Sequence, residues 1–395
     1  MKSLNILIIG AGMYVCGRGT DEYGTIMPAV LEWTKENNLG DVYVAATGPK
    51  SVRVAKRKIN QLQRKMDVAV SLTYFPQGKR QDEECYKEAL KRIPKPAVCI
   101  VAVPDNLHKD IAATAMKEGL HTLVVKPLAP TTKEVYELID IQKKKNVYCA
   151  VEFHKRFDYA NLKLKDTIEQ GVIGELLYFV AEFSQRKSMP TKIFKKWVET
   201  TNVFQYLGIH YVDIIYFVTG AVPERVMAIG QKGWLLSRGI NTYDSIQGII
   251  EWKMPSGKRF SSYILTNWID PESTSAISDQ KIKVIGTKGR LESDQKSRGI
   301  TIVTDKKGVE EPNPYFCSAY GPVGKISYRG YGIDSIRQFL NDVFKIEEGT
   351  LRIGDLEGKR PTFKDSIVPT QVLEAVNKTL RDGGTWVDIK KRHKI

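Results

Sequence analysis

A short glycine-rich segment, Gly10-Ala11-Gly12, ends the first apolar run of the chain, Leu4–Ile9. The missing side chains would let the backbone turn tightly and approach the pyrophosphate of a dinucleotide. Val15 stands where a third glycine is usual, and the next helix is expected only near Thr25, so the predicted phosphate loop is long and includes Arg18, which could pair with a phosphate. A plain strand-to-helix turn is the alternative, but the position after the first strand of an alternating pattern favours a cofactor.

The end of the second predicted strand, Val42–Thr47, indicates which dinucleotide is bound. NAD sites usually end this strand with an acidic residue that binds the ribose 2′-hydroxyl. Here Thr47 and Gly48 are followed by Lys50 and Arg53, and no carboxylate lies among them. A hydroxyl, a small residue and two cations suit a 2′-phosphate, so the sequence favours NADP over NAD. The alternative is that both cations are simply exposed helix residues.

Lys126 follows another predicted strand, Thr122–Val125, and precedes Pro127. Open α/β sheets bind their ligands at the carboxyl ends of their strands, and a proline fixes the turn that follows. Desolvation or a nearby positive charge there would lower the pKa of a lysine toward a working value. We therefore predict a functional lysine, with an ordinary surface lysine as the alternative.

These residues need a scaffold that brings strand ends together, and the chain supplies one. Up to about Val151, short apolar runs alternate with helical patterns, which predicts βαβ units and a parallel sheet. The expected strands are Leu4–Ile9, Val42–Thr47, Val68–Phe75, Ala97–Val103, Thr122–Val125 and Val147–Val151. Further strand-like runs after Arg156 predict an antiparallel sheet. They are Leu176–Ser184, Ser245–Trp252, Phe260–Asn267 and Lys281–Gly286.

Length and composition set the limits. A chain of 395 residues exceeds one ordinary hydrophobic core, so we predict two domains, 1–150 and 151–395, with a helix at 365–380 that packs back across the boundary. The five cysteines form no CxxC pair or His/Cys cluster, which argues against a disulfide framework or a metal site and for the cytoplasm. No stretch approaches the roughly 20 apolar residues of a membrane span. The net charge of +15 is spread along helices, so we expect no nucleic acid and infer attraction of an anionic cofactor or substrate.

Several segments, in order along the chain, resemble the glucose–fructose oxidoreductase and inositol dehydrogenase family, Gfo/Idh/MocA. Val103-Pro104-Asp105-Asn106-Leu107-His108 is similar to its TP-x-x-x-H segment, and Val125-Lys126-Pro127 to its Glu-Lys-Pro segment. The later similar segments are 153–157, 171–175, 208–213 with the G-x-H-x-x-D pattern, and 285–289. The resemblance implies a Rossmann domain, then an α+β domain with a large open, mostly antiparallel sheet. The uncovered face of this sheet implies a homodimer or homotetramer.

The family resemblance also implies the site. The lysine of Glu-Lys-Pro and the histidine of G-x-H-x-x-D lie at the nicotinamide, which corresponds to Lys126 and His210. The predicted cofactor contacts are Gly10, Ala11, Gly12, Met13, Arg18, Thr47, Gly48, Lys50, Arg53, Val103, Pro104, Asn106, His108 and Lys126. The predicted substrate contacts are His154, Lys126, His210 and Asp213. His154 is included because Glu152, His154 and Arg156 would share one face of an extended strand.

Two departures from the family pattern matter. Many family dehydrogenases have an Asp four residues before the histidine, and this position is Tyr206, which could relay a proton as an acid or base or could be a packing residue. Val125 replaces the glutamate of Glu-Lys-Pro. The leading hypothesis is an NADP- or NAD-dependent dehydrogenase of a sugar, cyclitol or nucleotide sugar. A cofactor- or sugar-binding regulator, and a reductase of a non-sugar carbonyl or imine, remain alternatives.

Overall fold

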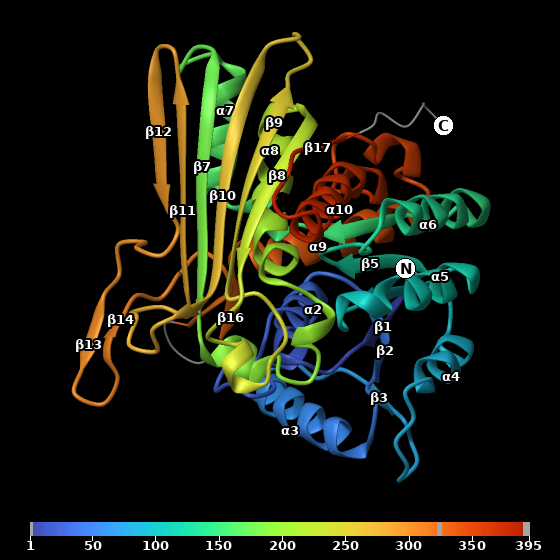
Figure 1. The fold of residues 1–395 in the computed structure, drawn as a ribbon. Coiled ribbons are helices and arrows are strands. Elements are labelled where there is room, and N and C mark those ends of the chain that lie inside the picture. Colours follow the sequence, from blue (N-terminus) through green and yellow to red (C-terminus); the bar gives the residue numbers. More distant parts are fainter. Residues whose placement is uncertain (1–2, 322–325, 390–395) are drawn as a thin grey trace. The chain divides into compact units, whose positions relative to one another are not determined.

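The computed structural model describes residues 3–321 and 326–389, which fold into two compact units (Figure 1). Within the described residues, the first unit consists of 3–129, 133–157 and 315–366, and the second of 130–132, 158–314 and 367–389. The division differs from the predicted one in its third segment, because residues 315–366 return to the first unit.

A six-stranded parallel sheet forms the centre of the first unit, in the order β3-β2-β1-β4-β5-β6. Its strands are β1 Leu4–Ile9, β2 Leu39–Ala45, β3 Leu72–Phe75, β4 Ala97–Val101, β5 His121–Val125 and β6 Cys149–Glu152. β1 and β4 are buried along their whole length, as expected for strands covered on both faces. The strand order reverses between β1 and β4, and ligands of such sheets bind at the carboxyl ends beside this point.

Helices connect these strands. They are α1 Met13–Cys16, α2 Ile26–Thr34, α3 Pro49–Met66, α4 Cys85–Arg92, α5 His108–Lys117 and α6 Thr132–Lys145. Short 3₁₀ turns lie at η1 Asp105–Leu107 and η2 His154–Phe157. In α3 the buried residues Ala55, Ile59 and Leu62 recur at helical spacing, while most of its Lys and Arg side chains face solvent, as the sequence predicted.

The returning segment completes the core of the first unit. It contains α9 Tyr331–Glu347, the short strands β15 Ser318–Tyr320 and β16 Ser327–Arg329, and the turns η7 Ile353–Leu356 and η8 Phe363–Ser366. α9 packs against α2, where Trp33 Nε1 donates a hydrogen bond to Asn341 Oδ1 at 2.8 Å. The apolar face of α9, with Ile336 and Leu340, joins the same core as β1. This pairing of distant segments has no local signal in the sequence.

The second unit contains a mixed seven-stranded sheet in the order β12-β11-β7-β10-β9-β8-β17. Only β7 and β10 are parallel among its described neighbours, so the predicted mostly antiparallel sheet is confirmed. Its strands are β7 Leu176–Arg186, β8 Val222–Gln231, β9 Ser245–Lys253, β10 Arg259–Asp270, β11 Ser278–Gly286, β12 Gly289–Asp294 and β17 Val387–Asp388, and a separate hairpin has β13 Ile302–Thr304 and β14 Gly308–Glu310. β8 was not among the strands predicted from the sequence.

Three helices of the second unit pack together with this sheet: α7 Tyr159–Glu169, α8 Ile209–Thr219 and α10 Ile367–Arg381. α10, predicted to pack back on the first domain, belongs to the second unit, where it contacts α8 and β8. Short turns are η3 Met189–Ile193, η4 Val198–Thr200, η5 Phe204–Gly208 and η6 Leu236–Arg238. Burial alternates strictly along β9, so one sheet face is covered and the other is open (Figure 1).

Across residues 3–321 and 326–389, every helix is too short or too polar to cross a membrane.

Candidate functional site

In the loop after β1, Gly10 and Gly12 are required for different physical reasons. Gly10 has φ +120°, and a Cβ there would lie 2.1 Å from the Ala102 carbonyl oxygen, so the fold itself requires glycine. Gly12 has φ −86°, which any residue adopts, and a Cβ there would meet no chain atom within 4 Å. Internal packing does not explain Gly12, whereas close approach of a pyrophosphate to the backbone does. The loop therefore fits a dinucleotide.

The chain between this loop and α2 is long, as predicted, and contains the short helix α1, which was not predicted. Lys58 of α3 donates from Nζ to the carbonyl oxygens of Thr20 and Glu22, at 2.7 and 3.0 Å. Arg18 donates from Nη1 to Ser51 Oγ at 2.8 Å. The loop is therefore held against α3, and the guanidinium of Arg18 lies at the first turn of that helix.

The carboxyl end of β2 carries the residues predicted to choose between NADP and NAD. Thr47, Lys50 and Arg53 are all exposed there. The backbone N–H of Asp82 donates to the Thr47 carbonyl oxygen at 3.0 Å. The loop before α4 therefore lies against this strand end through its backbone, and the Asp82 carboxylate accepts a hydrogen bond from the Glu84 N–H at 2.8 Å. Asp82 was not among the predicted residues because it lies far along the chain from the end of β2.

His108 joins the two loops that contain the similar family segments. Its Nδ1 lies 2.6 Å from the Pro127 carbonyl oxygen and its Nε2 lies 2.9 Å from that of Val103. The ring is buried, and burial lowers its pKa, while the charge of Asp105 and the two carbonyl contacts oppose this shift. Of the other predicted contacts on these loops, Val103 and Pro104 are half-buried and Asn106 is exposed. His108 thus fixes the backbone around Lys126, because Pro127 is the next residue.

Lys126 follows the last residue of β5, as predicted, and its peptide bond to Pro127 is cis. The side chain is half-buried. Burial lowers the pKa of Lys126 to about 8, and the negative charges of Asp105 and Glu152 oppose this shift. A lysine with a pKa near 8 exchanges its proton readily near neutral pH, which is what acid–base chemistry requires.

A buried network lies beside Lys126, at the end of β6. Glu152 is 3% exposed and accepts hydrogen bonds from Ser335 Oγ at 2.7 Å and from His154 Nδ1 at 2.9 Å. The Tyr14 hydroxyl lies 3.5 Å from the same His154 nitrogen. The His154 ring stacks on Tyr331 with centroids 5.8 Å apart. Ser335 and Tyr331 come from α9, so the returning segment completes this network.

The prediction of an extended strand through Glu152, His154 and Arg156 was wrong. β6 ends at Glu152, and His154–Phe157 form a 3₁₀ turn in which the Arg156 N–H donates to the Phe153 carbonyl oxygen at 3.0 Å. The alternation of polar and apolar residues did not identify a strand, because neighbouring side chains also point in different directions in a 3₁₀ turn. Arg156 is structural, since it pairs with Asp365 at 3.0 Å.

The remaining predicted catalytic residues lie in the second unit, at the start of α8. His210 and Asp213 are one turn apart on this helix and both are buried. Tyr206 lies in η5, a π-helical turn that runs directly into α8. It is half-buried and packs against Phe194, with ring centroids 4.7 Å apart, and against Trp197 and Trp268. These contacts support the packing interpretation of Tyr206.

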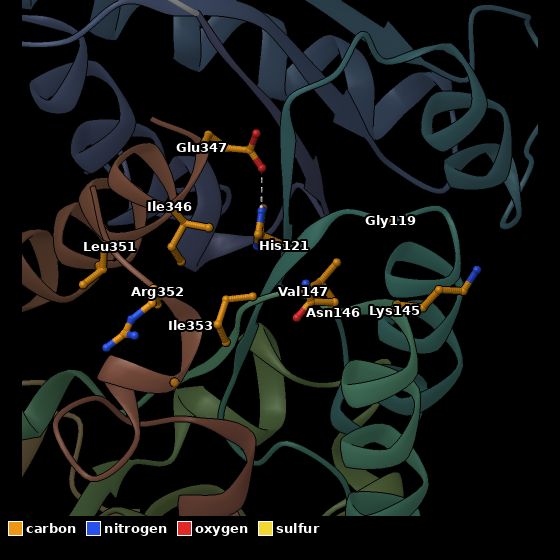
Figure 2. A pocket seen from close by; sticks show the side chains of 11 residues that line it. Gly119, His121, Lys145, Asn146, Val147, Ile346, Glu347, Leu351, Arg352 and Ile353 are labelled. Carbon is orange, nitrogen blue, oxygen red and sulfur yellow. Dashed lines mark hydrogen bonds and ion pairs between the residues drawn. The ribbon is translucent and has the colours of Figure 1, made fainter. Parts of the chain in front are cut away.

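A cavity of about 570 Å³ opens at the opposite edge of the first unit's sheet. It is lined by His121, the first residue of β5, and by Glu347 and Arg352, among others (Figure 2). His121 Nδ1 accepts from the Tyr148 N–H at 2.8 Å, and its Nε2 lies 2.9 Å from Glu347 Oε1. Parallel sheets bind ligands at their carboxyl ends, so this cavity is not the candidate active site.

The parallel sheet, its strand order and the glycine loop define an NAD-binding protein of the Rossmann class. Residues 4–153 match the oxidoreductase family with an NAD-binding Rossmann fold, and residues 161–292 match the GFO/IDH/MocA C-terminal domain. The chain therefore belongs to the Gfo/Idh/MocA family of oxidoreductases, as its motifs indicated.

Relatives of known name include a myo-inositol 2-dehydrogenase from Thermotoga maritima, 26% identical over 57% of this chain and 65% of that protein. A D-glucoside 3-dehydrogenase from Escherichia coli is 28% identical over 34% of this chain and 38% of that protein. An uncharacterized oxidoreductase from Streptococcus pneumoniae is 30% identical over 49% of this chain and 51% of that protein. The matches thus span between about a third and two thirds of these relatives.

Solved structures are similar over nearly the whole chain. The scyllo-inositol dehydrogenase of Lactobacillus casei with bound NAD(H) and scyllo-inositol aligns with a TM-score of 0.70 at 16% identity, covering 98% of this chain and 99% of that one. An inositol dehydrogenase homologue of Azotobacter vinelandii, complexed with NADH and myo-inositol, aligns with a TM-score of 0.71 at 18% identity, covering 98% of both chains. At such identities the likeness concerns the fold.

Proposed function

We propose that this protein oxidises a hydroxyl group of a sugar, cyclitol or nucleotide sugar, or reduces the corresponding ketone, with a nicotinamide dinucleotide as the redox partner. The observation that carries the proposal is Lys126, half-buried at a strand end with a pKa of about 8. Relatives named as inositol and glucoside dehydrogenases support the substrate class.

The proposed role of Lys126 is proton transfer at the substrate oxygen. A bound nicotinamide supplies the acceptor for the hydride that leaves the hydroxyl-bearing carbon. Neutral Lys126 accepts the proton of that hydroxyl, and in the reverse direction the ammonium returns it to the ketone oxygen. Oxidation should therefore speed up as the pH rises through about 8, and reduction should slow down.

We further propose that NADP is preferred over NAD. The exposed cations Arg18, Lys50 and Arg53 and the hydroxyl of Thr47 support this choice, because a 2′-phosphate needs charge-assisted donors. The hydrogen bond from Arg18 to Ser51 gives the guanidinium a fixed place at the start of α3. Asp82 supports the opposite choice, since its carboxylate could bind the ribose 2′-hydroxyl of NAD.

The other predicted contacts are proposed as follows. Gly10, Ala11, Gly12 and Met13 form the pyrophosphate loop, and Gly48 allows approach at the end of β2. His210 is a proposed catalytic residue, with Asp213 as a substrate contact. Tyr206 is proposed as an apolar wall more than as an acid, because three aromatic rings surround it.

Compartment and assembly are also proposals. The four buried cysteines Cys16, Cys85, Cys99 and Cys149 are free thiols, which suits the cytoplasm. Large apolar side chains, Leu177, Tyr178, Ile229 and Tyr263, are exposed on strands of the second unit's sheet. This supports a homodimer or homotetramer formed through the sheet.

The decisive experiment is titration of the purified protein with NADPH and NADH, followed by tryptophan fluorescence, and then a screen of polyols with the tighter cofactor. Tighter binding of NADPH is expected. Tighter binding of NADH would reverse the cofactor choice and favour Asp82 as the ribose contact. If neither cofactor binds, the oxidoreductase proposal fails and a regulatory sugar-binding role becomes the better one. Turnover of a non-sugar imine or carbonyl, with none of any polyol, would change the substrate class only.

A further inference from the structure

Glu152 is a buried carboxylate in the first unit, at the end of a strand whose other residues are apolar and buried. It ends β6 at 3% exposure, and its register partner on β5 is Val125, the residue before Lys126. Val125 is also where the family's Glu-Lys-Pro segment has its glutamate. A carboxylate is therefore present beside Lys126, on the neighbouring strand.

The surroundings of Glu152 fit its ionised form. Ser335 Oγ, at 2.7 Å, and His154 Nδ1, at 2.9 Å, contact its two different oxygens. Burial raises the pKa of Tyr14, and the charge of Glu152 and a hydrogen bond to it raise this pKa further. An ionised carboxylate only accepts hydrogen bonds, so these groups can all donate to it.

A buried negative charge needs a compensating positive charge. Lys126 provides one, since the charges of Glu152, from β6, and of Asp105, from η1, act on it. The charge of Lys126 in turn lowers the pKa of His108, from α5. Glu152 differs from Asp105 in being held by a separate network that includes α9.

We propose that Glu152 is a positioning residue for Lys126: held by Ser335 and His154, it fixes the ammonium group and sets how readily that group gives up its proton. The inference rests on the proposed role of Lys126. It adds that the proton affinity of this lysine is set within the first unit, by a carboxylate fixed by the returning segment 315–366.

The test measures the Lys126 amine directly in the protein without cofactor. The protein is labelled with a trace of isotopic acetic anhydride from about pH 6 to 10, and the label on the Lys126 peptide is quantified by mass spectrometry. For the wild type the midpoint is expected at about pH 8. In Glu152→Gln the loss of the negative charge should lower the midpoint of the labelling curve by about one pH unit. The neutral fraction at pH 7 would then rise about fivefold.

Two further variants make the outcome specific. Glu347→Gln changes the carboxylate that contacts a histidine at the other edge of the sheet, and should leave the Lys126 midpoint unchanged. The double variant Val125→Glu/Glu152→Gln moves the carboxylate to the register partner and should restore the midpoint toward the wild-type value. The double variant also tests the proposal if Glu152→Gln alone does not fold.

The proposal would be overturned if the midpoint is unchanged in folded Glu152→Gln. It would also be overturned if the midpoint in the folded double variant stays about one pH unit below that of the wild type. A second readout is the pH profile of kcat/KM, whose midpoint should move to lower pH in Glu152→Gln, whereas a merely structural role would lower activity at every pH alike. The labelling experiment needs no turnover. Failure of the dehydrogenase proposal can therefore be distinguished from failure of this one.

Discussion

The first unit contains two histidine–glutamate pairs, one at each edge of the same parallel sheet. His154 and Glu152 lie at the carboxyl ends of the strands, and His121 and Glu347 lie at the amino ends, each pair 2.9 Å apart. In the second pair both ring nitrogens of His121 have hydrogen-bond partners. Nδ1 accepts from the Tyr148 N–H, so Nε2 carries the proton and donates to Glu347. The first pair instead borders Lys126.

A histidine–glutamate pair therefore does not by itself indicate function. Each pair joins residues from two different elements, and in each the histidine is largely buried. What differs is the edge of the sheet, because helix N-termini and loops with free backbone N–H groups gather at the carboxyl ends. Substitutions at the two edges should therefore differ in their effect on turnover.

The largest effect is expected for Lys126→Met. The variant keeps an unbranched side chain of nearly the same length but cannot transfer a proton, so kcat should fall by about 10²–10⁴-fold. The measurement is steady-state turnover with a substrate found in the polyol screen, with circular dichroism and the urea unfolding curve as the controls for folding. A loss of less than tenfold would remove Lys126 from the chemistry.

A smaller effect is expected for Arg18→Ala, which tests the same edge at the end of β2. Loss of one charge-assisted contact should weaken NADPH binding by about tenfold and leave NADH binding nearly unchanged. Fluorescence titration with both cofactors measures this. Equal weakening of both would mean that Arg18 orders the loop and does not recognise the 2′-phosphate.

At the amino edge, Glu347→Ala should lower the free energy of unfolding by about 1 kcal/mol, because the largely buried Nε2–H of His121 loses its acceptor. Turnover by the folded variant should equal that of the wild type. Urea denaturation and steady-state kinetics measure the two quantities. A reduced kcat in the folded variant would mean that the pair at the amino ends also takes part in turnover.

The smallest effect is the pH dependence of stability due to His121. Burial lowers the pKa of His121 in the folded protein, so protonation favours the unfolded chain. Its contribution is fully present above pH about 6.5 and is lost as the pH falls from there through the lower folded-state pKa. The slope in this window should be at most about 1.4 kcal/mol per pH unit, and His121→Gln should lack it. Unfolding curves at several pH values measure the slope.

Much of the first unit could be predicted from the sequence. The alternation of apolar runs and helical patterns indicated the parallel sheet, and all six of its strands overlap those expected. Gly10 and Lys126 were found because strand-end signals are local: a tight turn needs glycine, and a lysine before a proline follows an apolar run. The missed strand β8, with Pro223 and Glu224 near its start, lacked such a pattern.

The fold class and the strand-end positions of the glycine loop and of Lys126 followed from the sequence alone, because each depends on residues within a few positions of one another. Which groups surround Lys126 and the strand-end loops depends instead on the tertiary structure. Ser335 reaches Glu152 across 183 residues of chain, Arg18 reaches Ser51 across 33, and Asp82 reaches Thr47 from another loop. Such contacts depend on how helices pack on the sheet, and hydrophobic periodicity specifies which face of a helix is buried but not which distant side chain it meets.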